Sequence, residues 1–90
     1  MKLVWRAAAL DDLQAIISYI ADRNPAAAAR LNAEIEGCAE VLRNHPLSHR
    51  PGRVEGTREA IVQPNYILIY EVGVGLVTIT AVVHSRQQYP

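Results

Sequence analysis

The chain has 90 residues, half of them apolar, and its nine Lys and Arg balance nine Asp and Glu. This length excludes a two-domain enzyme, and we expect one domain over residues 1–90. The single cysteine, Cys38, excludes an intramolecular disulfide and a multi-cysteine zinc site, and it favours a reducing compartment. The chain lacks an apolar run of the roughly 18–20 residues that a membrane span needs, so we expect a cytoplasmic protein without a membrane partner.

The first half of the chain predicts a short strand followed by two helices. Residues 2–6 have the pattern of a strand, and apolar residues between Leu10 and Ile20 then recur at i, i+3 and i+4, which indicates an amphipathic helix over roughly residues 7–22. Asn24 followed by Pro25 is typical of a helix N-cap with proline at the first helical position. We expect the second helix to end before His45, because a residue that precedes proline disfavours helical geometry. The tight joint makes the two helices a hairpin.

The second helix carries an apolar stripe that should face the protein core. Its members are Ala28, Leu31, Ile35, Cys38 and Leu42. Cys38 is therefore expected to be a buried, inert thiol rather than a nucleophile. The acidic residues of the helices, among them Asp11 and Asp12, are expected to be solvated and not catalytic.

The second half of the chain predicts antiparallel strands. Residues 47–56 contain two glycines and a proline and read as a loop, and strands are expected over residues 58–63, 66–72 and 76–85, with a three-residue turn at 73–75. The predicted fold is α+β, with an N-terminal helical hairpin packed on a four-stranded, mainly antiparallel sheet.

Symmetric closure of the turn at residues 73–75 predicts which side chains share a face of the sheet. It places Tyr70 opposite Thr78 and Leu68 opposite Thr80 on an open face, to which His84 and Arg86 belong by parity. The more apolar face is expected to receive the helices; it comprises Ile67, Ile69, Ile79, Ala81 and Val83.

A local basic patch lies between His45 and Arg58. Eight of the nine basic residues in the chain are Arg, and three of them fall in this segment against the single acidic Glu55. Arginine suits planar recognition of carboxylate or phosphate, so the patch is either a binding surface or a consequence of composition alone. His45 and His49 lie beside the arginines with His84 elsewhere, but a proline follows His45 and a fourth ligand is not evident, so we expect no metal site.

Three runs of residues carry a resemblance to a known family. They are RVEGTRE at 53–59, PNYILIYEV at 64–72 and VHSRQQYP at 83–90. These runs resemble the C-terminal half of the RelE/ParE superfamily of bacterial toxins, and the helical hairpin with Asn24-Pro25 resembles its N-terminal half. The resemblance implies the RelE/ParE-like fold and the toxin of a type II toxin-antitoxin, or plasmid stabilisation, module. It also implies a hetero-oligomer with a cognate antitoxin of the ParD or RelB kind, and no cofactor.

Two mechanisms are implied by this resemblance. RelE-like members cleave messenger RNA in the ribosomal A site, whereas ParE-like members inhibit DNA gyrase without being hydrolases. RelE-like enzymes have an Arg directly after the first Tyr of the Tyr-x-x-x-Tyr strand, and this chain has Ile67 there. We therefore expect a ParE-like inhibitor of DNA gyrase, with a ribosome-dependent mRNA endoribonuclease as the alternative.

The resemblance also marks candidate site residues. The expected target-binding residues are Arg53, Arg58, His84, Arg86 and Tyr89. If the chain is a ribonuclease, His84 would act as acid or base, Arg58 and Arg86 would hold the phosphate, and Tyr89 would stack on a base. Alternatively, these two residues have only structural roles: His84 caps the last strand, and Arg86 pairs with Glu59 or with the antitoxin.

Overall fold

The computed structural model describes residues 1–62 and 65–87, so the predicted strand end at Gln63 and the candidate Tyr89 lie outside the described residues. Two helices and five strands are described. In chain order they are β1 (Lys2–Trp5), α1 (Ala7–Ala21), α2 (Pro25–Asn44), β2 (Arg50–Pro51), β3 (Arg58–Val62), β4 (Tyr66–Gly73) and β5 (Leu76–His84).

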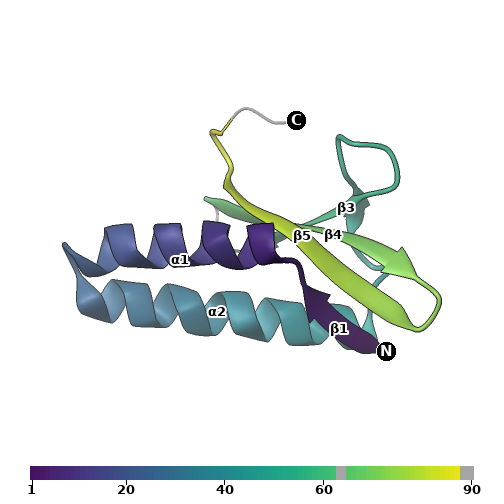
Figure 1. The fold of residues 1–90 in the computed structure, drawn as a ribbon, viewed down its shortest axis with the longest axis horizontal. Coiled ribbons are helices and arrows are strands. Elements are labelled where there is room, and N and C mark those ends of the chain that lie inside the picture. The colour runs from purple at the N-terminus through teal and green to yellow at the C-terminus, as the bar shows by residue number, and fades with distance from the viewer. Residues whose placement is uncertain (63–64, 88–90) are drawn as a thin grey trace.

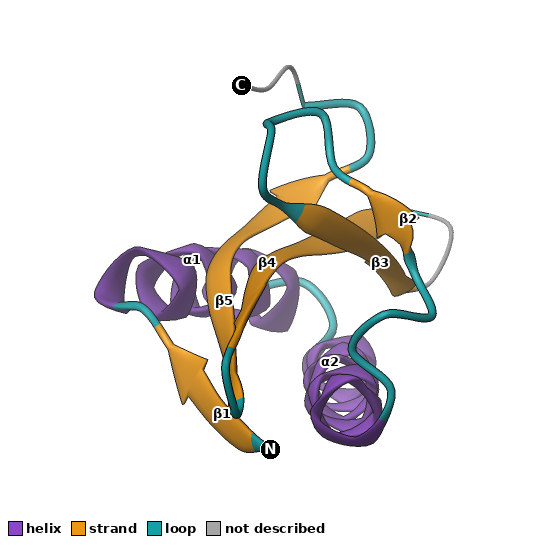
Figure 2. Cartoon of the chain, turned by 90° about the vertical axis from the view of Figure 1, so that its right-hand side faces the viewer, coloured by secondary structure: helices purple, strands orange, loops and turns teal. Residues whose placement is uncertain are grey.

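The two helices cover one face of a single sheet, as Figures 1 and 2 show. The strand order is β1-β5-β4-β3-β2, with β1 parallel to β5 and the other neighbours antiparallel. The predicted α+β fold is confirmed, but the sheet has five described strands instead of four. The additional strand, β2, consists of Arg50 and Pro51 within the predicted loop, and two residues are too few to show an alternating pattern.

The predicted helices agree with the observed ones to within about a residue. The Asn24 side chain accepts a hydrogen bond from the backbone N–H of Ala27 at 3.1 Å, which satisfies one of the free donors at the start of α2. Leu31, Ile35 and Leu42 are buried against the sheet. In the part of the chain that the structure describes, neither helix is both long and apolar enough to cross a membrane.

The turn between β4 and β5 is shorter than predicted, and a β-bulge follows it. Gly73 pairs with Leu76, so only Val74 and Gly75 form the turn, and Gly75 takes a φ of 65° that favours glycine. Further along, Tyr70 pairs with Ile79 while Ile69 pairs with Ala81, which leaves Thr80 as an extra residue in β5.

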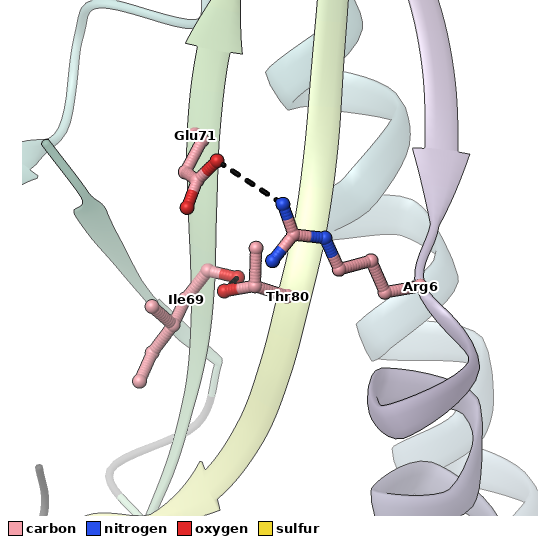
Figure 3. Close-up of polar contacts among 4 residues, drawn as sticks. All are labelled: Arg6, Ile69, Glu71 and Thr80. Carbon is pink, nitrogen blue, oxygen red and sulfur yellow. Dashed lines mark hydrogen bonds and ion pairs between the residues drawn. The ribbon is translucent and has the colours of Figure 1, made fainter.

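The Thr80 hydroxyl donates a hydrogen bond to the Ile69 carbonyl at 3.2 Å. Figure 3 shows the two residues side by side at the bulge.

The predicted faces of β4 and β5 were wrong for most residues. The side that packs against the helices holds Leu68, Tyr70, Val77, Ile79 and Val82, whereas a separate apolar cluster on the other side comprises Ile67, Ile69, Ala81 and Val83. Ile79 lies on the predicted side, and so does Thr78, which stands between the helix-facing Val77 and Ile79. The other assignments were wrong because the shorter turn and the bulge change the register. Since both faces of these central strands are apolar, alternation along the sequence does not identify the one that receives the helices.

Asp12 connects α1 to the sheet. β1 ends at Trp5, and the backbone N–H of the next residue, Arg6, donates to the Ile79 carbonyl oxygen of β5. Beyond Ile79, β5 has no neighbouring strand on this side among the described residues. The Asp12 carboxylate accepts a hydrogen bond from the backbone N–H of Val82 at 3.0 Å. The prediction that Asp12 is simply solvated was therefore wrong: its side chain satisfies a strand donor that has no partner strand.

Candidate functional site

The face of the sheet that the helices leave open is the first candidate surface. The loop between β2 and β3 and the segment after β5 both extend to this side of the sheet, away from the helices (Figures 1 and 2). Near the end of β3, the start of β4 and the end of β5, Ile61 pairs with Ile67 and Ile67 pairs with Val83. We call these three residues the aliphatic row; Ile67 and Val83 are only 3% and 5% exposed, whereas Ile61 is 55% exposed. This part of the open face is thus apolar.

Glu59 anchors the loop between β2 and β3. Its carboxylate is 3% exposed and lies 2.9 Å from Nη2 and 3.0 Å from Nε of Arg50. The backbone N–H of Arg53 donates to the other carboxylate oxygen at 3.2 Å. Glu59 therefore pairs with Arg50. The alternative in which Arg86 pairs with Glu59 was wrong. A buried carboxylate with charge-assisted hydrogen bonds of this kind fixes the loop that carries Arg53.

A second ion pair lies where α1 begins. Figure 3 shows the Arg6 guanidinium reaching past β5 toward Glu71 on β4, at a nitrogen–oxygen distance of 3.5 Å. Both side chains are about half exposed, so the pair contributes little to stability.

Arg58 does not lie on the open face. It pairs in register with Tyr70, on the side of the sheet that packs against the helices, and its Nη1 donates to the His49 carbonyl at 2.8 Å. The Tyr70 hydroxyl donates to the Pro46 carbonyl at 2.7 Å, so the two side chains together hold the segment that follows α2. Burial raises the pKa of the Tyr70 hydroxyl, an effect that the positive charge of Arg58 partly offsets.

Arg58 also lines a shallow pocket of about 310 Å³ with Leu47, Pro51, Gly56, Thr57 and Val72. In the adjoining loop, a Cβ at Gly52 would collide with the side chain and backbone of Thr57, so this close approach requires glycine.

His84 is the last residue of β5, and Arg86 lies in the turn that follows. His84 pairs with Tyr66, their rings meet edge to face at 5.2 Å, and Tyr66 packs against the helix-facing core. The prediction that parity places His84 on the open face was wrong, because the extra residue Thr80 reverses the alternation. His84 Nδ1 accepts a hydrogen bond from the backbone N–H of Arg86 at 3.0 Å, which leaves only Nε2 for other partners, while the Arg86 side chain is exposed.

The structure does not bring the predicted site residues into one cluster. Arg58 lies opposite Tyr70 and His84 lies opposite Tyr66, and these positions are separated by four residues of β4, or about 13 Å. Arg53 belongs to the loop near Arg58, and Tyr89 lies outside the described residues.

Sequence reasoning did not identify Glu59 or Asp12 as anchors. For Glu59 the available signal was an acidic residue at a predicted strand position directly after the arginines at 50, 53 and 58.

Cys38 is half-buried in α2 and packs against the core, as predicted. Burial raises the pKa of its thiol, which disfavours the nucleophilic thiolate. Residues 1–62 and 65–87 contain no group of three or more His, Cys, Asp or Glu side chains that could hold a metal ion. His49 lies beside Tyr70 and His84 beside Tyr66, so these two histidines contact residues four positions apart along β4.

Comparisons of the sequence identify relatives along nearly the whole chain. A protein of Sinorhizobium fredii named as a toxin, Y4kP, is 38% identical over 90 residues, which cover 99% of this chain and 93% of that protein. Toxin RelE2 of Caulobacter vibrioides is 36% identical over 86 residues, with 96% of this chain and 97% of that protein covered.

The fold is similar to solved toxin structures. A chain of the chromosomal ParDE toxin-antitoxin system of P. aeruginosa has a TM-score of 0.83 at 22% identity, with coverage of 93% of this chain and 95% of that one. YafQ of E. coli has a TM-score of 0.67 at 16% identity, with coverage of 93% and 92%. At these identities the likeness concerns the fold alone.

The family model described as the ParE toxin of the type II toxin-antitoxin system parDE matches residues 3–89. This match confirms the resemblance that the three C-terminal runs and the helical hairpin indicated. The chain belongs to the ParE toxin family of type II toxin-antitoxin systems, within the RelE/ParE superfamily.

Proposed function

We propose that this toxin arrests growth as a ParE-like inhibitor of DNA gyrase and that it does not cleave RNA. The observation that carries the proposal is the aliphatic row across the open face. Cleavage of RNA through the ribose 2′-hydroxyl needs a base, a positive charge at the phosphate and an acid for the leaving oxygen. Ile67, which stands where RelE-like enzymes have an Arg, is buried and supplies none of these.

The positions of the remaining candidates also support a non-enzymatic mechanism. A general acid or base must lie within hydrogen-bond reach of the group that it serves. Arg58 and His84 lie opposite residues of β4 that are about 13 Å apart, and both belong to the helix-facing side. Such separated groups suit contacts with a large protein target better than concerted chemistry at one phosphate.

The target-binding surface in this proposal comprises the two segments that flank the open face. Arg53, His84 and Arg86 supply its side chains, of which Arg53 and Arg86 are exposed cations, and Tyr89, outside the described residues, is included from the family resemblance alone. Arginine is frequent among the residues that dominate binding energy in protein interfaces. Arg58 acts in this surface by holding His49 and the loop in place.

A cognate antitoxin of the ParD or RelB kind is proposed to cover the helical hairpin. A groove of about 340 Å³ lies along α1 and α2, lined by Leu10, Leu13, Gln14, Ile17, Ser18 and Asn32. Two large side chains of α1, Leu10 and Tyr19, are 49% and 62% exposed. Exposed apolar surface of this kind is typical of a protein interface, and the similar structures of ParDE and of RelBE2 from Mycobacterium tuberculosis are toxin-antitoxin systems.

The alternative function is a ribosome-dependent mRNA endoribonuclease. It is favoured by the short chain distance between His84 and the exposed Arg86 at the end of β5, because an imidazole and a guanidinium are suited to proton transfer and phosphate binding. In this alternative Nε2 of His84 exchanges the proton, Arg58 and Arg86 hold the phosphate, and Tyr89 stacks on a base.

Expression of the toxin in cells without its antitoxin distinguishes the two functions. Inhibition of gyrase should produce filamentous cells and loss of negative supercoiling in a reporter plasmid while translation continues. Rapid arrest of translation with cut messages and normal supercoiling would contradict the proposal and favour the ribonuclease.

A further inference from the structure

A polar pocket, separate from the one that Arg58 lines, lies on the helix-facing side of the sheet, opposite to the aliphatic row. Its volume is about 230 Å³, and it is formed where the first turns of α2 meet the start of β4. Its lining residues are Ala27, Arg30, Leu31, Asn65 and Tyr66. None of them belongs to the target-binding surface proposed above.

The walls of this pocket are held in place by neighbouring contacts. The Asn65 carbonyl accepts a hydrogen bond from the backbone N–H of Ser85 at 2.6 Å. The Tyr66 ring meets the His84 ring edge to face, and Asn24 caps the helix turn that contains Ala27. The backbone around the pocket and the Tyr66 ring are therefore held in place before any ligand arrives, which reduces the entropy cost of binding.

The groups that line the pocket suit an anion. Arg30 brings a permanent positive charge with a planar set of N–H donors, and Tyr66 and Asn65 add a hydroxyl and an amide. The pocket also lies near the N-terminal end of α2, where the helix dipole is positive and the first turn has no acidic residue.

From this arrangement we infer that the pocket binds a carboxylate of an acidic peptide segment. A guanidinium binds a planar carboxylate with two parallel hydrogen bonds. A nucleic-acid phosphate is a poorer match, because the chain has zero formal net charge and an isoelectric point near 6.8, and nucleic-acid binding domains are usually strongly basic. The inference goes beyond the proposed function, since it concerns another surface and holds for either target.

Titration of the isotope-labelled toxin by NMR tests this inference. The probe is an acetylated, amidated pentapeptide with alternating Ala and Glu, and the same peptide with Gln in place of Glu is the control ligand. We expect saturable shifts of the Ala27, Asn65 and Tyr66 amide signals with the Glu peptide only. Arg30→Gln should weaken binding about tenfold or more, as expected for a lost charge-assisted hydrogen bond.

Arg43→Gln is the matched control, because Arg43 lies at the other end of the same helix and pairs with Glu40. This variant should bind the Glu peptide as the parent does. Equal binding of the Gln peptide, or unchanged affinity in a folded Arg30→Gln variant, would overturn the inference. Saturation by inorganic phosphate without saturation by the Glu peptide would overturn it as well and would assign the pocket to phosphate ligands.

Discussion

Ile67 is the residue at which the sequence and the structure bear most directly on mechanism. The family resemblance marked it as a position where the ribonucleases have an arginine, and the structure places it near the start of β4, on the side away from the helices, at 3% exposure. A buried isoleucine neither binds a phosphate nor transfers a proton. The proposed mechanism depends on this position more than on any other.

Arg86 tests the proposed target-binding surface. Its side chain is exposed after β5, so Arg86→Ala should change the free energy of unfolding by no more than about 0.5 kcal/mol. We expect the variant to lose growth arrest and to keep antitoxin binding, because a charged contact is removed while the fold remains. Colony counts after induction measure toxicity, and thermal denaturation measures stability.

Lys2→Ala is the control for this substitution, since it removes one exposed positive charge from β1, which pairs with the start of β5. It should leave toxicity intact. A stable and fully toxic Arg86→Ala variant would show that the target contacts another part of the surface.

At the scale of single elements, the helices could be predicted from the sequence but the faces of the sheet could not. Asn24 and Pro25 mark the start of α2 through local chemistry that operates within a few residues. The register of β4 and β5 depends on a two-residue turn and on the extra residue Thr80, and both faces of these strands are apolar. Without an apolar-polar alternation, nothing in the local sequence decides which face packs against the helices.

The unpredicted register also explains why the predicted site residues do not lie together. The family resemblance selected Arg58 and His84 by their positions in the chain, but a one-residue change of register determines the side of the sheet to which a residue belongs. The bulge moves His84 beside Tyr66. The anchoring role of Glu59 depends on the two-residue strand β2, which the sequence pattern did not indicate.

The contact between α1 and β5 makes a prediction at the scale of elements. Asp12→Ala should lower the free energy of unfolding by about 1–3 kcal/mol, because it leaves the partly buried N–H of Val82 without its acceptor. Asp11→Ala should change it by less than about 0.5 kcal/mol, since Asp11 is exposed on the same helix. Urea denaturation of both variants makes the comparison, and equal effects would show that the Asp12 bond does not stabilise the fold.

At the scale of the whole molecule, stability should fall in alkaline solution. Burial raises the pKa values of both Cys38 and Tyr70, which are about 8.5 and 10 in an unfolded chain. As the pH rises past these values, the unfolded state loses its protons first, so the free energy of unfolding decreases. The stabilisation from these two protonated groups is fully present below the pKa values of the unfolded chain. It is lost as the pH rises through the higher pKa values of the folded protein.

Urea denaturation between pH 7 and pH 11 measures this dependence. Tyr70→Phe should be less stable than the parent at neutral pH, because it lacks the hydrogen bond to Pro46, and its stability should decline less above pH 10. A parent protein whose stability is constant or increases over this range would contradict the assignment of buried, protonated groups.

The most direct test of the central claim is inhibition of DNA gyrase by the purified toxin in a supercoiling reaction with relaxed plasmid. The account predicts that supercoiled product decreases with toxin concentration, that the antitoxin reverses the effect, and that Arg86→Ala abolishes it. Full supercoiling at every toxin concentration, with a preparation that still arrests growth when expressed, would contradict the claim that gyrase is the target.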